Sequence, residues 1–170
     1  MASPIYYFTE RGTGVSPDGS FVPDNAVVCT QDQYKNQSQW VLDNGQVVVN
    51  PNLLSISKAT QNQILSAACQ QVIVSGFVSS ALGSACTYGS NAVDQRNILL
   101  AAQSAKGGLL SCQNTTGVWV REAHTQVQAQ QVAEDFVTAS DAVRTKLAGL
   151  LAQVAAATTV AAVQAVVWSA

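Results

Sequence analysis

The side chains best suited to chemistry are few in this chain and lie far apart. His124 is the only histidine. It comes directly before Thr125, a residue type that caps helices, so we expect it at the surface at a helix start. Glu134 and Asp135 are adjacent, and neighbours on a helix point about 100° apart, so they cannot converge as a catalytic pair. Catalysis needs positioned titratable groups, and we therefore expect no catalytic residues and no enzyme activity.

The cysteines do not form a recognisable metal site. Cys29, Cys69, Cys86 and Cys112 include no Cys-x-x-Cys pair, and one histidine adds little to a zinc ligand set. We interpret them as small buried apolar side chains in the reduced state, with disulfides as the alternative. Phosphate-binding and dinucleotide-binding glycine patterns are absent from the sequence. We expect neither a metal nor a cofactor.

Composition favours contacts with other protein chains. Charged residues make up 11% of the 170 residues and the net charge is −2, whereas globular domains usually contain about 25% charged residues. The eight basic residues are scattered and form no stripe that could neutralise phosphates, so we expect no nucleic-acid binding. A surface with so few charges is typical of a chain that another chain covers, in a homo- or hetero-oligomer.

The last part of the chain raises the question of a membrane span. Residues 147–170 carry no charge and are long enough to cross a bilayer. They also contain two glutamines and two threonines, and their apolar residues fall on one side, so we expect packing within the protein and no membrane span. The first residues lack a secretory pattern, so we expect no signal peptide.

Residues 1–52 are expected to form a small β-rich module. Apolar runs rich in strand formers alternate with turn signals there. Thr30 and Gln33 have the spacing of a capping box that opens a helical turn. The expected strands are residues 5–8, 27–30 and 46–49, with turns at residues 16–20 and at Asp43-Asn44-Gly45.

Residues 53–170 are expected to form a mainly helical domain with one inserted β-hairpin. An apolar stripe at Leu65, Cys69, Val72 and neighbouring positions predicts a helix that stops at Gly76. The uncharged stretch over residues 76–88 is read as a shaped loop beside a short strand. Further expectations are a helix from Ser90 or Asn91 to residues 107–108, a hairpin of residues 109–112 and 118–121, a long helix capped by Thr125 with Gln128, and a short final helix after Thr158-Thr159. The fold class is therefore α+β, with a C-terminal helical hairpin.

Two groups of side chains are candidates for protein contacts. In the long helix, residues at steps of four and three form a seam typical of coiled coils, with Ser140 as its one polar member. Aromatic residues near turns and element ends pack in a core by default, and anchoring an interface is the alternative. The interface candidates are Tyr34, Trp40, Phe77, Leu82, Tyr88, Trp119, Val143, Leu147 and Leu150.

Two regions resemble proteins of bacteriophage tails. Residues 22–34, Val-Pro-Asp-Asn-Ala-Val-Val-Cys-Thr-Gln-Asp-Gln-Tyr, resemble the opening of tail-fibre assembly proteins, and the resemblance continues through the turn and strand of residues 43–51. Residues 58–168 resemble a helical domain of unassigned function that is common on phage tail proteins. Its pieces here are Cys69, residues 76–88, 94–99 and 117–119, and the closing residues 160–168.

The resemblance implies a protein that is made in the bacterial host cytoplasm and associates with the tail fibre or another tail protein, in the virion tail. It implies no catalytic residues. Either the chain stays on the fibre as an accessory part, which we favour, or it is an assembly chaperone that leaves. A receptor- or glycan-binding tip module, with Trp40, Tyr88 and Trp119 as stacking platforms, is a further alternative, and a cell-wall enzyme is another.

Overall fold

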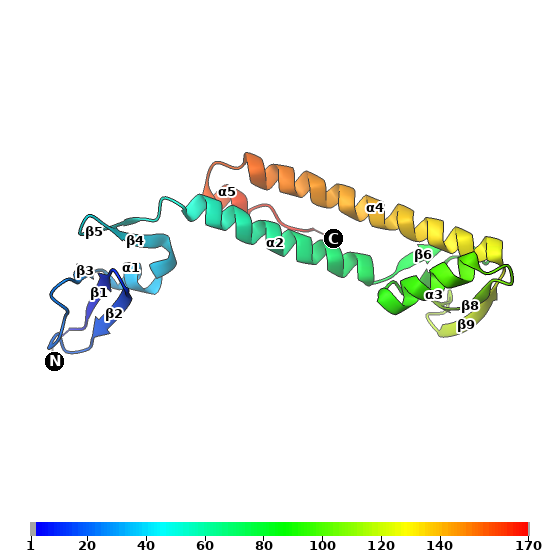
Figure 1. The fold of residues 1–170 in the computed structure, drawn as a ribbon, viewed down its shortest axis with the longest axis horizontal. Helices are drawn as coiled ribbons and strands as arrows, with labels where there is room; N and C mark the ends of the chain where they lie inside the picture. The colour runs from blue at the N-terminus through cyan, green and yellow to red at the C-terminus, as the bar shows by residue number, and fades with distance from the viewer. Residues whose placement is uncertain (1–2, 170) are drawn as a thin grey trace. The chain divides into compact units, whose positions relative to one another are not determined.

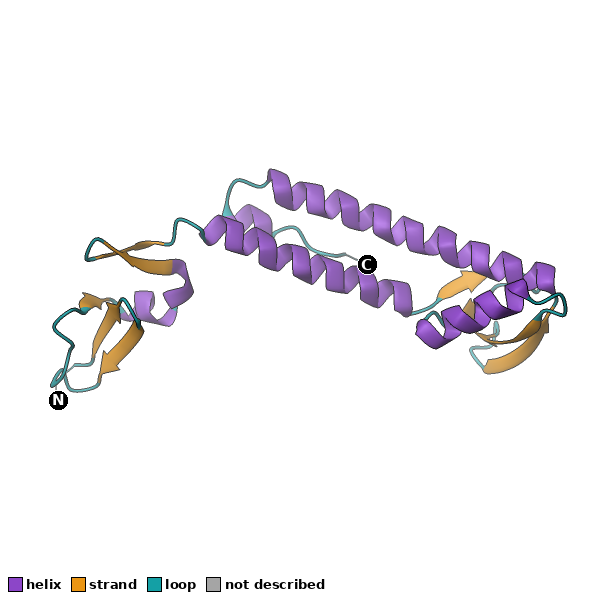
Figure 2. Cartoon of the chain, viewed as in Figure 1, coloured by secondary structure: helices purple, strands orange, loops and turns teal. Residues whose placement is uncertain are grey.

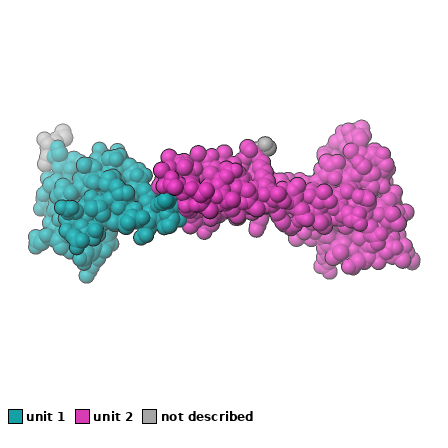
Figure 3. Space-filling view, turned by 90° about the horizontal axis from the view of Figure 1, so that it is seen from above, with its two compact units in different colours: residues 1–57 teal, residues 58–170 magenta. Residues whose placement is uncertain are grey.

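The computed structural model describes residues 3–169 of an α+β chain in two compact units, residues 1–57 and 58–170 (Figure 3). The division falls inside helix α2 (Leu53–Val74), five residues after the boundary expected from the sequence. Each unit is described by itself below.

The N-terminal unit combines a three-stranded sheet with a separate hairpin. Strands β1 (Ile5–Thr9), β2 (Gly12–Ser16) and β3 (Val27–Cys29) form an antiparallel sheet in the order β2-β1-β3. Helix α1 (Gln31–Lys35) and the short 3-10 helix η1 (Gln37–Gln39) lead to the antiparallel hairpin of β4 (Trp40–Asp43) and β5 (Gln46–Val49). Strands β1, β3 and β5 were expected from the sequence, whereas β2 and β4 were not.

Local signals account for much of this unit. Thr30 caps α1, and its side chain and that of Gln33 form both hydrogen bonds of the expected capping box. Asn44 and Gly45 have φ values of 48° and 76°, as a two-residue hairpin turn between right-twisted strands requires. The core of the unit is small, because Phe8 and Ser16 are the only buried residues among residues 3–57.

The C-terminal unit contains a long antiparallel helix pair. Helix α4 (Gln126–Ala156) runs beside α2, and the short helix α5 (Val160–Gln164) follows it (Figure 1). Leu65 of α2, Val154 of α4 and Val163 of α5 are fully buried. The Nζ of Lys58 donates to the carbonyl oxygen of Ala155 at 2.7 Å. The Nε2 of Gln61 donates to the carbonyl oxygen of Val166 at 2.7 Å, which holds the C-terminal segment against α2.

A small α/β head lies at one end of this helix pair. Strands β6 (Phe77–Ser79), β7 (Cys86–Tyr88), β8 (Gly108–Gln113) and β9 (Trp119–His124) form an antiparallel sheet in chain order, and helix α3 (Ala92–Gln103) packs with the first half of α4 beside it (Figure 2). The core comprises Phe77, Cys86, Tyr88, Ile98, Ala101, Ala102, Leu110, Cys112, Ala129 and Val132. Residues 76–88, expected to be a loop beside one strand, are a complete hairpin of β6 and β7.

The helix starts of this unit follow the sequence closely. Asn91, one of two expected caps, caps α3 through the backbone N–H groups of Val93 and Asp94. Thr125 and Gln128 form the expected capping box of α4. One expectation is wrong: His124 is only 2% exposed. As the last residue of β9, it points into the core.

Candidate interaction surfaces

The apolar seam of α4 is covered in part within the same chain, and around Ser140 it faces α2. Ser140 and Val154 are buried, and Val143, Leu147 and Leu150 are half-buried. A small space of about 50 Å³ separates Val72 and Ile73 of α2 from Phe136, Ser140 and Val143 of α4. The Oγ of Ser140 has no hydrogen-bond partner there. Of the three seam residues proposed as interface candidates, Val143 therefore faces α2, and Leu147 and Leu150 are partly covered within the chain.

Two of the aromatic candidates belong to the core of the head. Phe77 is 7% exposed and Tyr88 is 1% exposed. Their ring centroids lie 5.7 Å apart, and the ring of Phe136 lies 5.3 Å from that of Phe77. This burial assigns both residues to core packing, the default for aromatics. It also removes Tyr88 from the side chains that could stack on a sugar at the surface.

Tyr88 and His124 form a buried polar pair. The Tyr88 hydroxyl lies 2.7 Å from Nε2 of His124, and Nδ1 of His124 lies 3.0 Å from the carbonyl oxygen of Glu122. A carbonyl oxygen only accepts, so Nδ1 carries the proton and Nε2 accepts from the hydroxyl. Burial, supported by the neighbouring thiols of Cys112 and Cys86, raises the pKa of Tyr88 well above its usual range. The pair is a structural element of the core.

The outer face of the β8–β9 hairpin is an exposed candidate surface. In the register, Leu109 lies opposite Ala123, Ser111 opposite Arg121 and Gln113 opposite Trp119. Alternate residues of a strand share a face, so these six side chains lie on one side. Leu109 is 67% exposed and Trp119 is 55% exposed. Trp119 thus remains accessible to a partner.

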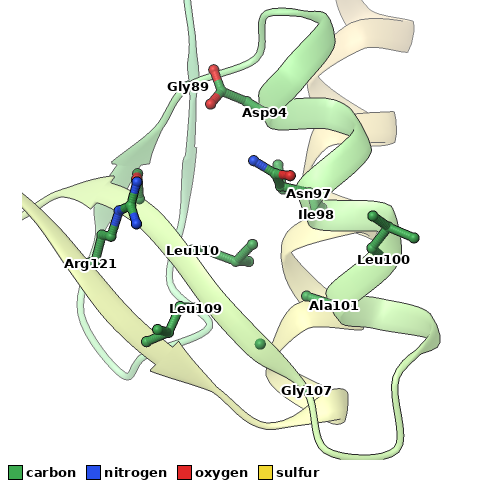
Figure 4. A pocket seen from close by; sticks show the side chains of 12 residues that line it. Gly89, Asp94, Asn97, Ile98, Leu100, Ala101, Gly107, Leu109, Leu110 and Arg121 are labelled. Carbon is green, nitrogen blue, oxygen red and sulfur yellow. The ribbon is translucent and has the colours of Figure 1, made fainter.

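A polar groove lies between α3 and the same hairpin (Figure 4). It has a volume of about 400 Å³, with Asp94 and Asn97 on α3 and Arg121 on β9. Asp94 also accepts a hydrogen bond from the backbone N–H of Asn91, at 3.3 Å. Ile98, Ala101 and Leu110 line the groove as well. A carboxylate, an amide and a guanidinium beside apolar side chains suit a polar peptide segment.

A second groove follows the free edge of β6. It has a volume of about 710 Å³ and is lined by residues 78–81 and by one face of α4 that includes Gln131, Asp135 and Thr138. Val78 at its rim is 60% exposed. Leu82, another interface candidate, is half-buried against the head core. Edge strands carry backbone groups that a further strand can pair with.

The remaining aromatic candidates lie in the N-terminal unit. The ring centroid of Tyr34 is 5.0 Å from that of Tyr6. Trp40 lines a hollow of about 630 Å³ together with Phe8, Glu10, Gln37 and other residues of the unit. The indole Nε1 of Trp40 is buried and has no hydrogen-bond partner. Both aromatic residues are half-buried.

Other kinds of site have little support in the described chain. Within residues 3–169 there is no group of three or more His, Cys, Asp and Glu side chains that could hold a metal ion. All four cysteines are free thiols. No helix among these residues combines the length and the apolar character needed to cross a membrane. Comparison with protein-family models, with curated proteins and with solved structures gives no match.

Proposed function

We propose that this protein is a non-enzymatic part of a phage tail that docks on the tail fibre through its N-terminal unit and stays there. The observation that carries the proposal is the small core of that unit. Phe8 is the only buried apolar side chain among residues 3–57. Units of this size rarely gain enough stability from their own core and need a staple or a partner. A bound fibre chain would supply the missing apolar contacts.

The surface of the N-terminal unit suits a fibre partner. Val28 on β3 is 62% exposed, Phe21 is 70% exposed and Val49 on β5 is 57% exposed. Strands β2 and β3 are the two edges of the three-stranded sheet. Fibre chains fold by slow pairing of β-strands, and their edges need a cover during that time. Apolar side chains beside free strand edges can provide such a cover.

Co-purification with the fibre tests the docking surface. The tagged chain is co-expressed in the bacterial cytoplasm with the tail-fibre protein of the phage that encodes the chain. Val28→Asp places a charge on β3, and we expect about a tenfold or greater loss of bound fibre. Val93→Asp is the matched control, because Val93 on α3 is 66% exposed. Equal retention of fibre by wild type and Val28→Asp contradicts the proposed surface.

Mass spectrometry of purified virions separates the two ways of acting on the fibre. Stoichiometric presence of the chain in virions supports an accessory part. Absence from virions, together with rescue of fibre solubility on co-expression, supports the alternative of a dissociating chaperone.

A glycan-binding tip module is a second candidate function, and one observation favours it. The hollow of the N-terminal unit places Trp40 beside Glu10, Gln37 and Asn44. An aromatic ring among carboxylate and amide groups is a combination that can bind a sugar by stacking and hydrogen bonds. Binding of the isolated chain to a glycan array, lost in Trp40→Ala, would support this function.

A further inference from the structure

We propose that the groove beside strand β6 binds an extended, basic segment of a partner protein, which adds to the sheet of the head as a fifth strand. The inference concerns residues 78–81 and one face of α4, and it is independent of fibre docking, which we assign to the N-terminal unit. Strand β6 is the first strand in the order β6-β7-β8-β9. Its side away from β7 therefore meets no other strand within residues 3–169.

The hydrogen-bond pattern of the sheet determines which backbone groups lie on that free side. The N–H of Asn114 donates to the carbonyl oxygen of Val118, in line with the register of β8 and β9. Bonded and non-bonded pairs alternate along antiparallel strands, so Gln113 bonds toward β7, where it lies opposite Thr87. By the same alternation, Thr87 does not bond to Val78, its opposite residue on β6. The N–H and C=O of Val78 therefore point out of the sheet edge, where a further strand can bond to them.

Helix α4 forms the opposite wall of the groove, and its first half lies beside β6 (Figure 1). Four side chains at steps of three and four form one row along this wall: Gln128, Gln131, Asp135 and Thr138. The row covers about 15 Å of helix. A strand rises about 3.3 Å per residue, so the groove accepts about five residues of an extended chain. A strand edge facing a helix is a recurring arrangement for the recognition of extended peptides.

The charge in the groove determines which segment fits. Asp135 is the only charged residue among the described residues that line the groove, and it is half-buried. Its Oδ1 accepts a hydrogen bond from Nε2 of Gln131 at 2.8 Å. A neutral amide leaves the negative charge in place, and a carboxylate has about four acceptor positions. A lysine or arginine side chain of the segment can therefore form a charge-assisted hydrogen bond with Asp135.

Two exposed valines provide the apolar part of the groove. Val78 on β6 is 60% exposed, and Val127 near the start of α4 is 74% exposed. Both line the groove. Covering them removes apolar surface from water, which favours binding. The segment that fits thus carries apolar side chains beside these valines and a cation beside Asp135.

Selection from a peptide library tests the proposal on the full chain. The probe is a library of random twelve-residue peptides, panned on the immobilised wild-type protein, and we expect the selected peptides to contain Lys or Arg among apolar residues. Fluorescence anisotropy with one labelled selected peptide then measures affinity. Asp135→Asn keeps an acceptor for Gln131 but loses the charge, and should weaken binding about fivefold or more. Asp141→Asn is the matched control, because it removes an exposed carboxylate from another part of α4.

A backbone test establishes whether the peptide binds as a strand. Val78→Pro removes the N–H that points away from β7, so the bonds within the sheet remain, and peptide binding should weaken at least about tenfold. Val78→Thr keeps this N–H and is the control, and circular dichroism verifies that both variants are folded. On the wild-type chain, N-methyl groups on one set of alternate peptide amides should abolish binding and those on the other set should not, because only one edge of the added strand faces β6.

Four results would each overturn the proposal: no selected peptide, selected peptides without a cation, equal affinity of Asp135→Asn and Asp141→Asn, or equal effects of the two methylated sets. A wild-type dimer in light scattering that the peptide dissociates would assign the edge to a second copy and overturn it as well. Fibre docking is tested separately by Val28→Asp, so either proposal can fail alone.

Discussion

The Tyr88–His124 pair yields the sharpest stability prediction. Both side chains are at most 2% exposed and their hydrogen bond is 2.7 Å long. In Tyr88→Phe, the Nε2 of His124 loses its donor in the core, which should cost about 1–3 kcal/mol of unfolding free energy. In His124→Leu, the Tyr88 hydroxyl loses its acceptor, at a similar cost. The double variant removes both polar groups, so its loss should be smaller than the sum of the two.

Urea unfolding, followed by the helical circular dichroism signal, measures these changes. A loss of about 2 kcal/mol lowers the unfolding midpoint by about 1 M urea. Tyr34→Phe is the control, because Tyr34 is half-buried and contacts the Tyr6 ring without a comparable buried polar partner, and it should change stability by less than about 0.5 kcal/mol. Additive effects in the double variant, or a Tyr88→Phe midpoint equal to that of the control, would refute the reasoning.

Three further predictions test local features. Gly107→Ala should destabilise the chain by at least about 2 kcal/mol, because Gly107 has φ +69° and a Cβ would meet the His124 carbonyl oxygen. Its control is Gly149→Ala on α4, where a Cβ meets open space. That variant should stabilise the chain by about 0.5–1 kcal/mol in the same urea assay. Thr125→Ala should cost about 1 kcal/mol by removing the α4 cap, and an unchanged midpoint would contradict that role. The pKa of buried Tyr88 is raised in the folded chain, so as the pH rises the unfolded chain loses the hydroxyl proton first. The free energy of unfolding should therefore fall above about pH 10. The urea midpoint of Tyr88→Phe, measured over the same pH range, should fall less steeply than that of the wild type.

Much of the fold could be predicted because its signals are local. The capping boxes at Thr30 and Thr125 use residues three positions apart, and both form as expected. The Asn44-Gly45 turn needs positive φ at two successive residues, which these residue types tolerate. Strand β2 was not predicted, because Gly12 and Gly14 interrupt the alternation typical of a strand. It forms through its antiparallel pairing with β1.

The candidate surfaces were less predictable. Exposure decides whether an aromatic residue can meet a partner, and Phe77 and Tyr88 are buried whereas Trp119 is exposed. All three lie in or beside strands of similar apolar character. The strand alternation of β8 and β9 places Trp119 on the outer face, and only the register of the hairpin establishes this.

The sequence alone determined the helix starts, the turns and the low charge of the chain, because each depends on residues within about four positions or on composition. The tertiary structure decided the rest. It paired Tyr88 with His124 across 36 positions, placed Ser140 and Val143 of α4 opposite α2, and left most of α2 outside the core. Apolar spacing describes which side of a helix can be buried, but only long-range packing determines which neighbour covers it and which side stays open.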